Sequence, residues 1–163
     1  MPRRAEGRRA EGRRAADAAD AVTDAAPAVP LPTVLVVDDS SMMRTLMSRL
    51  AESGGDFRVA GTAADGRQGI DRARALQPAL CLLDLEMPVM GGLDALPAIR
   101  AVSDAAVIVV SSIAGPGSPE RRACLMAGAS AVVAKPSGAV SADLAERRGE
   151  ALLAAMRAAL APP

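Results

Sequence analysis

Four apolar segments of the sequence are each followed directly by polar side chains that can do chemistry. Three of these side chains are carboxylates, two are hydroxyls and one is an ammonium: Asp38, Asp39, Asp84, Ser111, Ser112 and Lys135. Lys135 is the only lysine of the chain, and the other 18 of its 19 basic residues are arginines. A compact ammonium can approach a single oxygen, whereas a planar guanidinium suits bidentate pairing. The lone lysine therefore indicates a specific role rather than general surface charge.

Carboxylates that share one place repel one another unless a cation is present. Oxygen ligands with room for water suit Mg²⁺, which takes few protein carboxylates. Beside a lysine and a hydroxyl, such a metal suits phosphoryl transfer, because cations share the charge of the transferring group. The chain contains no histidine, so a carboxylate is the natural nucleophile.

This chemistry requires that the apolar segments form neighbouring strands of one sheet. Short apolar runs predict strands at residues 33–37, 57–63, 79–83, 105–110 and 131–134. Helical spacing and capping residues predict helices at 40–53, 66–76, 93–102, 118–129 and 141–160. The alternation predicts an α/β fold with a parallel sheet covered on both faces, in the common strand order 2-1-3-4-5. Because ligands of such sheets bind at the carboxyl ends of the strands, the polar side chains are expected to gather there.

Residues 1–32 differ from the rest of the chain. They begin with a tandem RRAEG pattern and pass into an Ala- and Pro-rich stretch. This segment has no apolar face to bury, and its prolines stop any helix. It also lacks the apolar run of a signal peptide. We expect a disordered tail and linker at 1–32, followed by one domain at 33–160.

The overall composition excludes several functions. Nineteen acidic residues balance 19 basic ones, which disfavours a nucleic-acid-binding surface, and a single aromatic residue, Phe57, disfavours stacking platforms for bases or flavins. The apolar runs are too short to cross a membrane. Cys81 and Cys124 form no CxxC pair, which favours reduced cysteines in a cytoplasmic protein.

The segments VLVVDDS, LLDLEMPVMGG, VIVVSS and VVAKPSG together resemble the receiver domain of bacterial two-component response regulators, over about residues 33–160. The resemblance implies a flavodoxin-like (βα)5 three-layer sandwich, and receivers are themselves known examples of the strand order given above. It implies that Asp84 accepts phosphate from a histidine kinase. It also implies that Asp39, Asp84 and the backbone carbonyl of Glu86 bind Mg²⁺, with Asp38 acting through water. Ser111, Ser112 and Lys135 are then expected at the phosphoryl group, and the bond before Pro136 is expected to be cis.

Within that family, the segments DDSSMMR, GTAADG, LDLEMPVMGGLDAL, VSSIAG and AKPSG are most similar to the regulatory domain of the chemotaxis methylesterase. That enzyme carries a separate hydrolase domain with a serine–histidine–aspartate triad. The present chain ends after the fifth predicted helix and has no histidine, so it is not expected to be an esterase. The resemblance implies a chemotaxis-type histidine kinase as partner and an unknown downstream protein.

Two departures and several alternatives stand beside this interpretation. Many receivers carry an aromatic switch residue three positions before the lysine, where this chain has Val132, and Gly91 replaces a common aspartate. Taken singly, the acids also fit helix caps and turns, and the lysine fits a surface charge. Other functions are a phosphate sink, a truncated remnant of a methylesterase, an aspartyl phosphatase, or a flavin carrier on the same fold.

Overall fold

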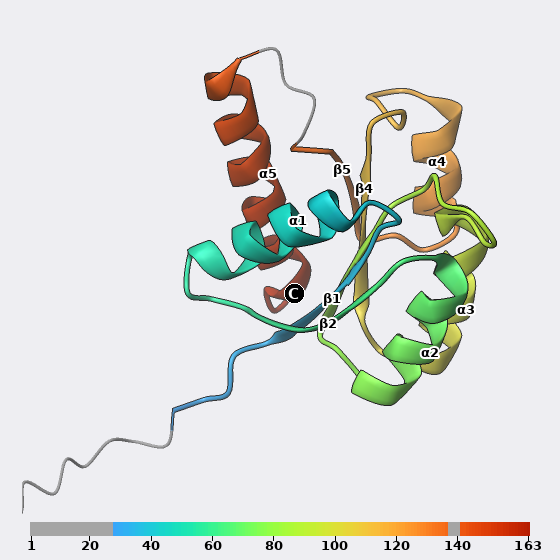
Figure 1. The fold of residues 1–163 in the computed structure, drawn as a ribbon, viewed down its shortest axis with the longest axis horizontal. Helices are drawn as coiled ribbons and strands as arrows, with labels where there is room; N and C mark the ends of the chain where they lie inside the picture. Colours follow the sequence, from blue (N-terminus) through green and yellow to red (C-terminus); the bar gives the residue numbers. More distant parts are fainter. Residues whose placement is uncertain (1–27, 137–140) are drawn as a thin grey trace, which may run out of the picture.

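The computed structural model describes residues 28–136 and 141–163 and contains a parallel sheet with helices on both faces (Figure 1). The strands are β1 Thr33–Val37, β2 Arg58–Ala63, β3 Leu80–Leu83, β4 Ala106–Ser111 and β5 Ala131–Ala134. The helices are α1 Ser41–Ser53, α2 Gly66–Leu76, α3 Gly92–Val102, α4 Pro119–Met126 and α5 Ala142–Leu160. The order β2-β1-β3-β4-β5 confirms the predicted topology.

The strands are apolar on both faces because each face is covered by a helical layer. Successive side chains of a strand point to opposite faces. In β1, Val34 and Val36 pack in the core under α1 and α5, whereas Leu35 and Val37 pack in the core under α2, α3 and α4. Figure 1 shows the same two layers on either side of the sheet. Continuous apolar strands are therefore what a doubly covered parallel sheet requires.

Side chains at the predicted positions define where helices begin. Ser40 is the N-cap of α1 and accepts a hydrogen bond from the Met43 amide at 3.3 Å. Ser118 caps α4 in the same way, but α4 ends at Met126 rather than at 129 as predicted. The chain leaves the helix because Gly128 adopts a φ of +101°, a left-handed conformation that favours glycine.

The remaining sequence predictions for the fold concern the tail, the cysteines and the membrane. The predicted N-terminal tail lies outside the described residues up to position 27. Cys81 and Cys124 are free and buried, and burial raises the pKa of Cys81 to about 12, so its thiol stays protonated at neutral pH. Among the described residues, no helix has the length and apolar character needed to span a membrane.

Candidate functional site

The parallel register brings the ends of β1, β3, β4 and β5 to one edge of the sheet. Val37 pairs with Leu83, and Ser111 pairs with Ala134. The Asp84 amide donates to the Val37 carbonyl at 2.9 Å, and the Lys135 amide donates to the Ser111 carbonyl at 3.1 Å. These two bonds continue the ladders by one residue, so the residues that follow the strands are positioned by the sheet itself.

Lys135 lies between two buried carboxylates. Its Nζ is 3.0 Å from Asp38 Oδ2 and 3.2 Å from Asp84 Oδ2. Asp38 is fully buried and Asp84 is 2% exposed, while the lysine side chain is 15% exposed. The contact joins three strands, β1, β3 and β5, through one cation. The prediction that these residues meet at the sheet edge is therefore correct in its geometry.

Asp39 completes the acidic group on the solvent side. Asp38, Asp39 and Asp84 each present a carboxylate oxygen, and these oxygens lie within 4.8 Å of one another. Asp39 is exposed, whereas the other two are buried. Three carboxylates and one ammonium leave the group with two uncompensated negative charges.

The donor set fits Mg²⁺. The Oδ2 atoms of Asp38 and Asp84 are buried and accept no hydrogen bond of proper geometry, although both lie within ion-pair distance of Lys135. Buried carboxylate oxygens with unused lone pairs are costly unless a partner is supplied. A divalent cation would neutralise the two remaining charges through oxygen ligands, as Mg²⁺ prefers.

The surroundings of Asp84 and Lys135 raise the pKa of both groups. Burial raises the pKa of the Asp84 carboxyl above its ordinary value, and the charge of Asp38 adds to that rise, while Lys135 opposes it. Burial lowers the pKa of the Lys135 ammonium, but Asp38 and Asp84 outweigh burial, so the pKa is raised overall. The lysine is therefore held in its charged form at neutral pH.

The two serines after β4 differ in placement. Ser111 is buried, and its Oγ accepts hydrogen bonds from the amides of Ile113 at 3.1 Å and Ala114 at 3.3 Å. Ser112 is exposed. Ser111 thus orders the loop after β4, and no described contact joins the hydroxyl of either serine to the carboxylates or to the Lys135 ammonium.

Glu86 reaches the acidic group through its backbone. Its amide donates to Asp84 Oδ1 at 3.4 Å, and its side chain is exposed. Within the described residues, its carbonyl oxygen receives no hydrogen bond. This placement is compatible with the predicted role of the Glu86 carbonyl as a metal ligand, and it gives no role to the Glu86 carboxylate.

Gly92 allows α3 to begin directly behind Asp84. Its amide donates to the Leu85 carbonyl at 2.9 Å, and a Cβ at this position would overlap the Asp84 carbonyl oxygen. Any side chain here must push the segment that carries Asp84 away from the sheet edge.

Gly92→Ala should therefore destabilise the protein by about 2 kcal/mol, a typical cost of overpacking. Urea unfolding measures this loss. Gly115→Ala is the matched control, because a Cβ there meets no atom within 4 Å. Equal stability of the two variants would contradict the close approach at Gly92.

The predicted cis bond before Pro136 is wrong. No peptide bond among the described residues is cis, and the Lys135–Pro136 bond is described. The trans form is favoured by about 0.5–1 kcal/mol even before proline. Here the Lys135 amide completes the ladder to Ser111 and the lysine Nζ reaches both carboxylates with a trans bond, so this geometry does not require the cis isomer.

Comparison with known families agrees with the fold. The model of the response regulator receiver domain matches residues 34–145 of the chain. The chain belongs to the response regulator receiver family. Its predicted family, flavodoxin-like fold and strand order are thereby confirmed.

Curated relatives of this receiver are named protein-glutamate methylesterase/protein-glutamine glutaminase. The protein-glutamate methylesterase/protein-glutamine glutaminase of Bacillus licheniformis is 42% identical over 111 residues, which are 68% of this chain and 31% of that protein. The corresponding protein of Symbiobacterium thermophilum is 40% identical over 130 residues, covering 80% of this chain and 36% of that protein. The receiver thus spans about a third of the length of the curated relatives that it matches.

Solved structures match over most of the receiver. The response regulator domain of Thermotoga maritima CheB has a TM-score of 0.72 at 33% identity, covering 82% of this chain and all of that chain. The structure of the P1 domain of CheA3 in complex with CheY6 from R. sphaeroides matches with a TM-score of 0.68 at 36% identity, again covering 82% of this chain and all of the matched chain.

Val132 lies three residues before Lys135, at the position where the resemblance to receivers would lead us to expect an aromatic switch residue. The side chain is 4% exposed and packs in the core under α2, α3 and α4. Its carbonyl accepts a hydrogen bond from Arg121 Nη1 of α4 at 2.8 Å. This receiver therefore joins α4 to β5 through an arginine and a backbone carbonyl at that position.

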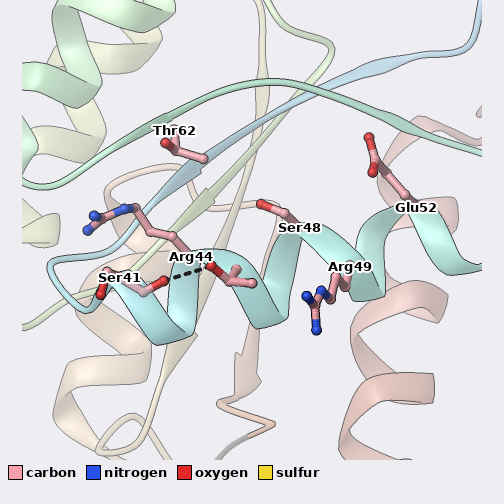
Figure 2. A pocket seen from close by; sticks show the side chains of 7 residues that line it. Ser41, Arg44, Ser48, Arg49, Glu52 and Thr62 are labelled. Carbon is pink, nitrogen blue, oxygen red and sulfur yellow. Dashed lines mark hydrogen bonds between the residues drawn. The ribbon is translucent and has the colours of Figure 1, made fainter.

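Arginines behind the site were not foreseen from the sequence. Arg44 of α1 donates to the carbonyls of Asp38 and Asp39, and Arg148 of α5 donates to the Lys135 carbonyl at 3.2 Å. Arg44 also lines a shallow pocket on α1, together with Ser41, Ser48 and Thr62 (Figure 2). Only its position in the first turns of the helix after the acidic pair hinted at such a contact.

Proposed function

We propose that this receiver accepts a phosphoryl group on Asp84 in a Mg²⁺-dependent reaction. Asp38, Asp39, Asp84 and the carbonyl of Glu86 would hold the metal, with Asp38 acting through water. Lys135 would bind a phosphoryl oxygen, with the hydroxyls of Ser111 and Ser112 as further candidates once the loop after β4 rearranges. Mg²⁺, when bound, supplies positive charge against the oxygens of the transferring group.

One observation carries the proposal: the Lys135 ammonium lies 3.2 Å from Asp84 Oδ2 inside a group that still has two excess negative charges. The Asp84 carboxylate is the nucleophile in reach of that cation. Burial and the neighbouring charge of Asp38 raise its pKa and so destabilise the anion, and Lys135 offsets part of that cost. Comparison with chemotaxis receivers supports the same role.

The transfer balances as a simple displacement. A carboxylate oxygen of Asp84 forms a bond to phosphorus, and the bond from phosphorus to the donor breaks. With acetyl phosphate the leaving group is acetate, and with a phosphohistidine it is the imidazole nitrogen. Lys135 stays protonated throughout, because Asp38 and Asp84 raise its pKa. Its ammonium can then follow the charge from the carboxylate to the new phosphoryl oxygens.

Removal of Mg²⁺ tests the proposal directly. The wild-type chain incubated with acetyl phosphate and MgCl₂ should gain one phosphoryl group, detected by intact-mass spectrometry. The same incubation with excess EDTA should leave the mass unchanged, because the two excess negative charges repel a phosphoryl donor when no metal is bound. Uptake that is equal with and without Mg²⁺ would contradict the assigned metal role.

The proposed partner is a histidine kinase of the chemotaxis type. A neighbouring structure contains a CheA P1 domain with a CheY protein, which supports a chemotaxis-type histidine kinase as phosphoryl donor. We propose that the transfer takes place in the cytoplasm. We propose that output passes to a protein partner, without binding nucleic acid or inserting into a membrane. The chain holds no histidine for a serine–histidine–aspartate triad, which supports a phosphoacceptor rather than an esterase activity.

The other candidate functions predict different results. An aspartyl phosphatase would release phosphate continuously from a phosphate monoester, whereas a receiver is phosphorylated once and hydrolyses slowly. A phosphate sink would be phosphorylated normally by the kinase and would lower the phosphorylation of a second receiver in the same mixture. A methylesterase remnant would bind no partner after phosphorylation.

A further inference from the structure

We infer that Arg44 is a positioning residue that fixes Asp39 for the metal. This inference rests on the proposed Mg²⁺-dependent function. Arg44 Nη1 lies 2.8 Å from the carbonyl oxygen of Asp38 and 3.2 Å from that of Asp39. One guanidinium nitrogen thus holds two successive carbonyls of the acidic turn.

These two carbonyls belong to the peptide units on either side of the Asp39 Cα. The first unit joins Asp38 to Asp39, and the second joins Asp39 to Ser40. The second is also held at its other end, because the Ser40 amide donates to Asp38 Oδ1 at 2.9 Å. When both flanking peptide planes are fixed, the direction of the Cα–Cβ bond between them is fixed as well.

Asp39 needs this support more than its neighbours do. Asp38 and Asp84 are buried, and Lys135 contacts both. The Asp39 side chain is exposed, and within the described part of the chain no hydrogen bond or ion pair holds its carboxylate, although its oxygen lies within 4.8 Å of the other acids. Its place in the group is therefore set by the backbone, which Arg44 holds.

A charge effect of Arg44 would have the opposite sign from a positioning effect. A cation near the carboxylates repels Mg²⁺, so removing it would tighten metal binding if only charge mattered. Removing a group that orients a ligand weakens binding instead, commonly by 10-fold or more. The two explanations are separated by the direction of the change.

Arg49 provides a matched control on the same helix. It lines the same pocket as Arg44 but is exposed, and among the described contacts it makes none with the acidic turn. In Figure 2, Arg44 extends toward the start of α1, whereas Arg49 points in another direction further along the helix. Arg49→Met removes the same charge without touching the two carbonyls.

The experiment is a Mg²⁺ titration of uniformly ¹⁵N-labelled protein, followed by amide chemical shifts in ¹H–¹⁵N NMR spectra. Arg44→Met should weaken Mg²⁺ binding by about 10-fold, and Arg49→Met should leave it equal or slightly tighter. Arg44→Lys, which keeps a donor and the charge, should recover part of the loss. A dispersed amide spectrum recorded without Mg²⁺ shows whether each variant is folded. If Arg44→Met is not folded, Mg²⁺ binding by Arg44→Lys is compared with that of the wild type instead.

The outcomes are distinguishable. Unchanged or tighter Mg²⁺ binding in Arg44→Met, with normal binding by the wild type, would overturn the positioning role alone. Equal weakening in Arg44→Met and Arg49→Met would overturn it too, because Arg49 does not contact the acidic turn. A wild-type chain that bound no Mg²⁺ would overturn the proposed function together with this inference.

Discussion

Asp84→Asn should abolish phosphoryl uptake from acetyl phosphate and, without Mg²⁺, should make the protein more stable. Uptake is lost because an amide is not a nucleophile toward phosphorus. Stability rises because the ionised Asp84 is buried beside Asp38, and burial and that charge both raise its pKa. The gain should be on the order of 1 kcal/mol. Intact-mass spectrometry measures the first effect and urea unfolding the second.

The pH dependence of this gain has a definite sign. A carboxyl whose pKa is raised by folding binds more protons in the native state than in the unfolded state. Its contribution to stability is therefore present below the unfolded pKa and is lost as pH rises through the folded pKa. The advantage of Asp84→Asn should accordingly be largest at neutral pH and should shrink in acid.

Asp104→Asn is the matched control. Asp104 is exposed and lies just before β4, at the opposite edge of the sheet from the acidic group. Its substitution should change neither phosphoryl uptake nor stability. Uptake retained by Asp84→Asn would place the phosphoacceptor elsewhere, and a loss of stability in that variant would contradict the electrostatic cost assigned to the carboxylate.

Lys135→Met should lower the free energy of unfolding by about 3 kcal/mol, the usual cost of removing one partner of a buried ion pair. Methionine keeps an apolar stem but removes the cation that contacts Asp38 and Asp84. The pKa of Asp84 should rise further, because Lys135 is the group that opposes the rise. The loss of stability relative to wild type should therefore be greater at neutral than at acidic pH in urea unfolding.

Two further variants make this prediction specific. Arg72→Met removes a positive charge from an exposed position of α2 and should leave stability unchanged within about 0.5 kcal/mol. Lys135→Arg keeps the charge and should preserve the fold, yet it should impair phosphoryl uptake because a planar guanidinium does not approach one oxygen as a point charge does. Mg²⁺ should stabilise Lys135→Met more than wild type, since it supplies the missing positive charge.

If Lys135→Met were as stable as Arg72→Met, the ion pairs would contribute nothing to the fold. If Lys135→Arg took up phosphate like the wild type, the reason for a single lysine among 18 arginines would have to be sought elsewhere. Both results would contradict the central place given to Lys135 in the site.

Lysine and arginine make different contacts at the site. Lys135 contacts the carboxylates themselves, whereas Arg44 and Arg148 donate to backbone carbonyls of the residues that carry the reactive groups. A guanidinium with five donors suits the bridging of carbonyls. A compact ammonium suits the space between two carboxylates.

The sequence alone determined the class of fold and the edge of the sheet at which Asp38, Asp84 and Lys135 meet. Apolar runs of strand length, separated by amphipathic helices, specify a doubly covered parallel sheet, and residues directly after those runs must lie at its carboxyl edge. That reasoning placed Asp38, Asp84 and Lys135 in one group before any contact was known. It located most boundaries to within one residue, as for β2 at Arg58–Ala63 and β4 at Ala106–Ser111.

Only the tertiary structure decided which groups touch. The 3.0 and 3.2 Å contacts of Lys135 depend on strand register and on the reach of one side chain. The bonds of Arg44 to the acidic turn, the trans bond before Pro136 and the early end of α4 likewise depend on how neighbouring elements meet. Hydrophobic periodicity is a local property and specifies elements, whereas distances between side chains from different elements exist only once the sheet has assembled.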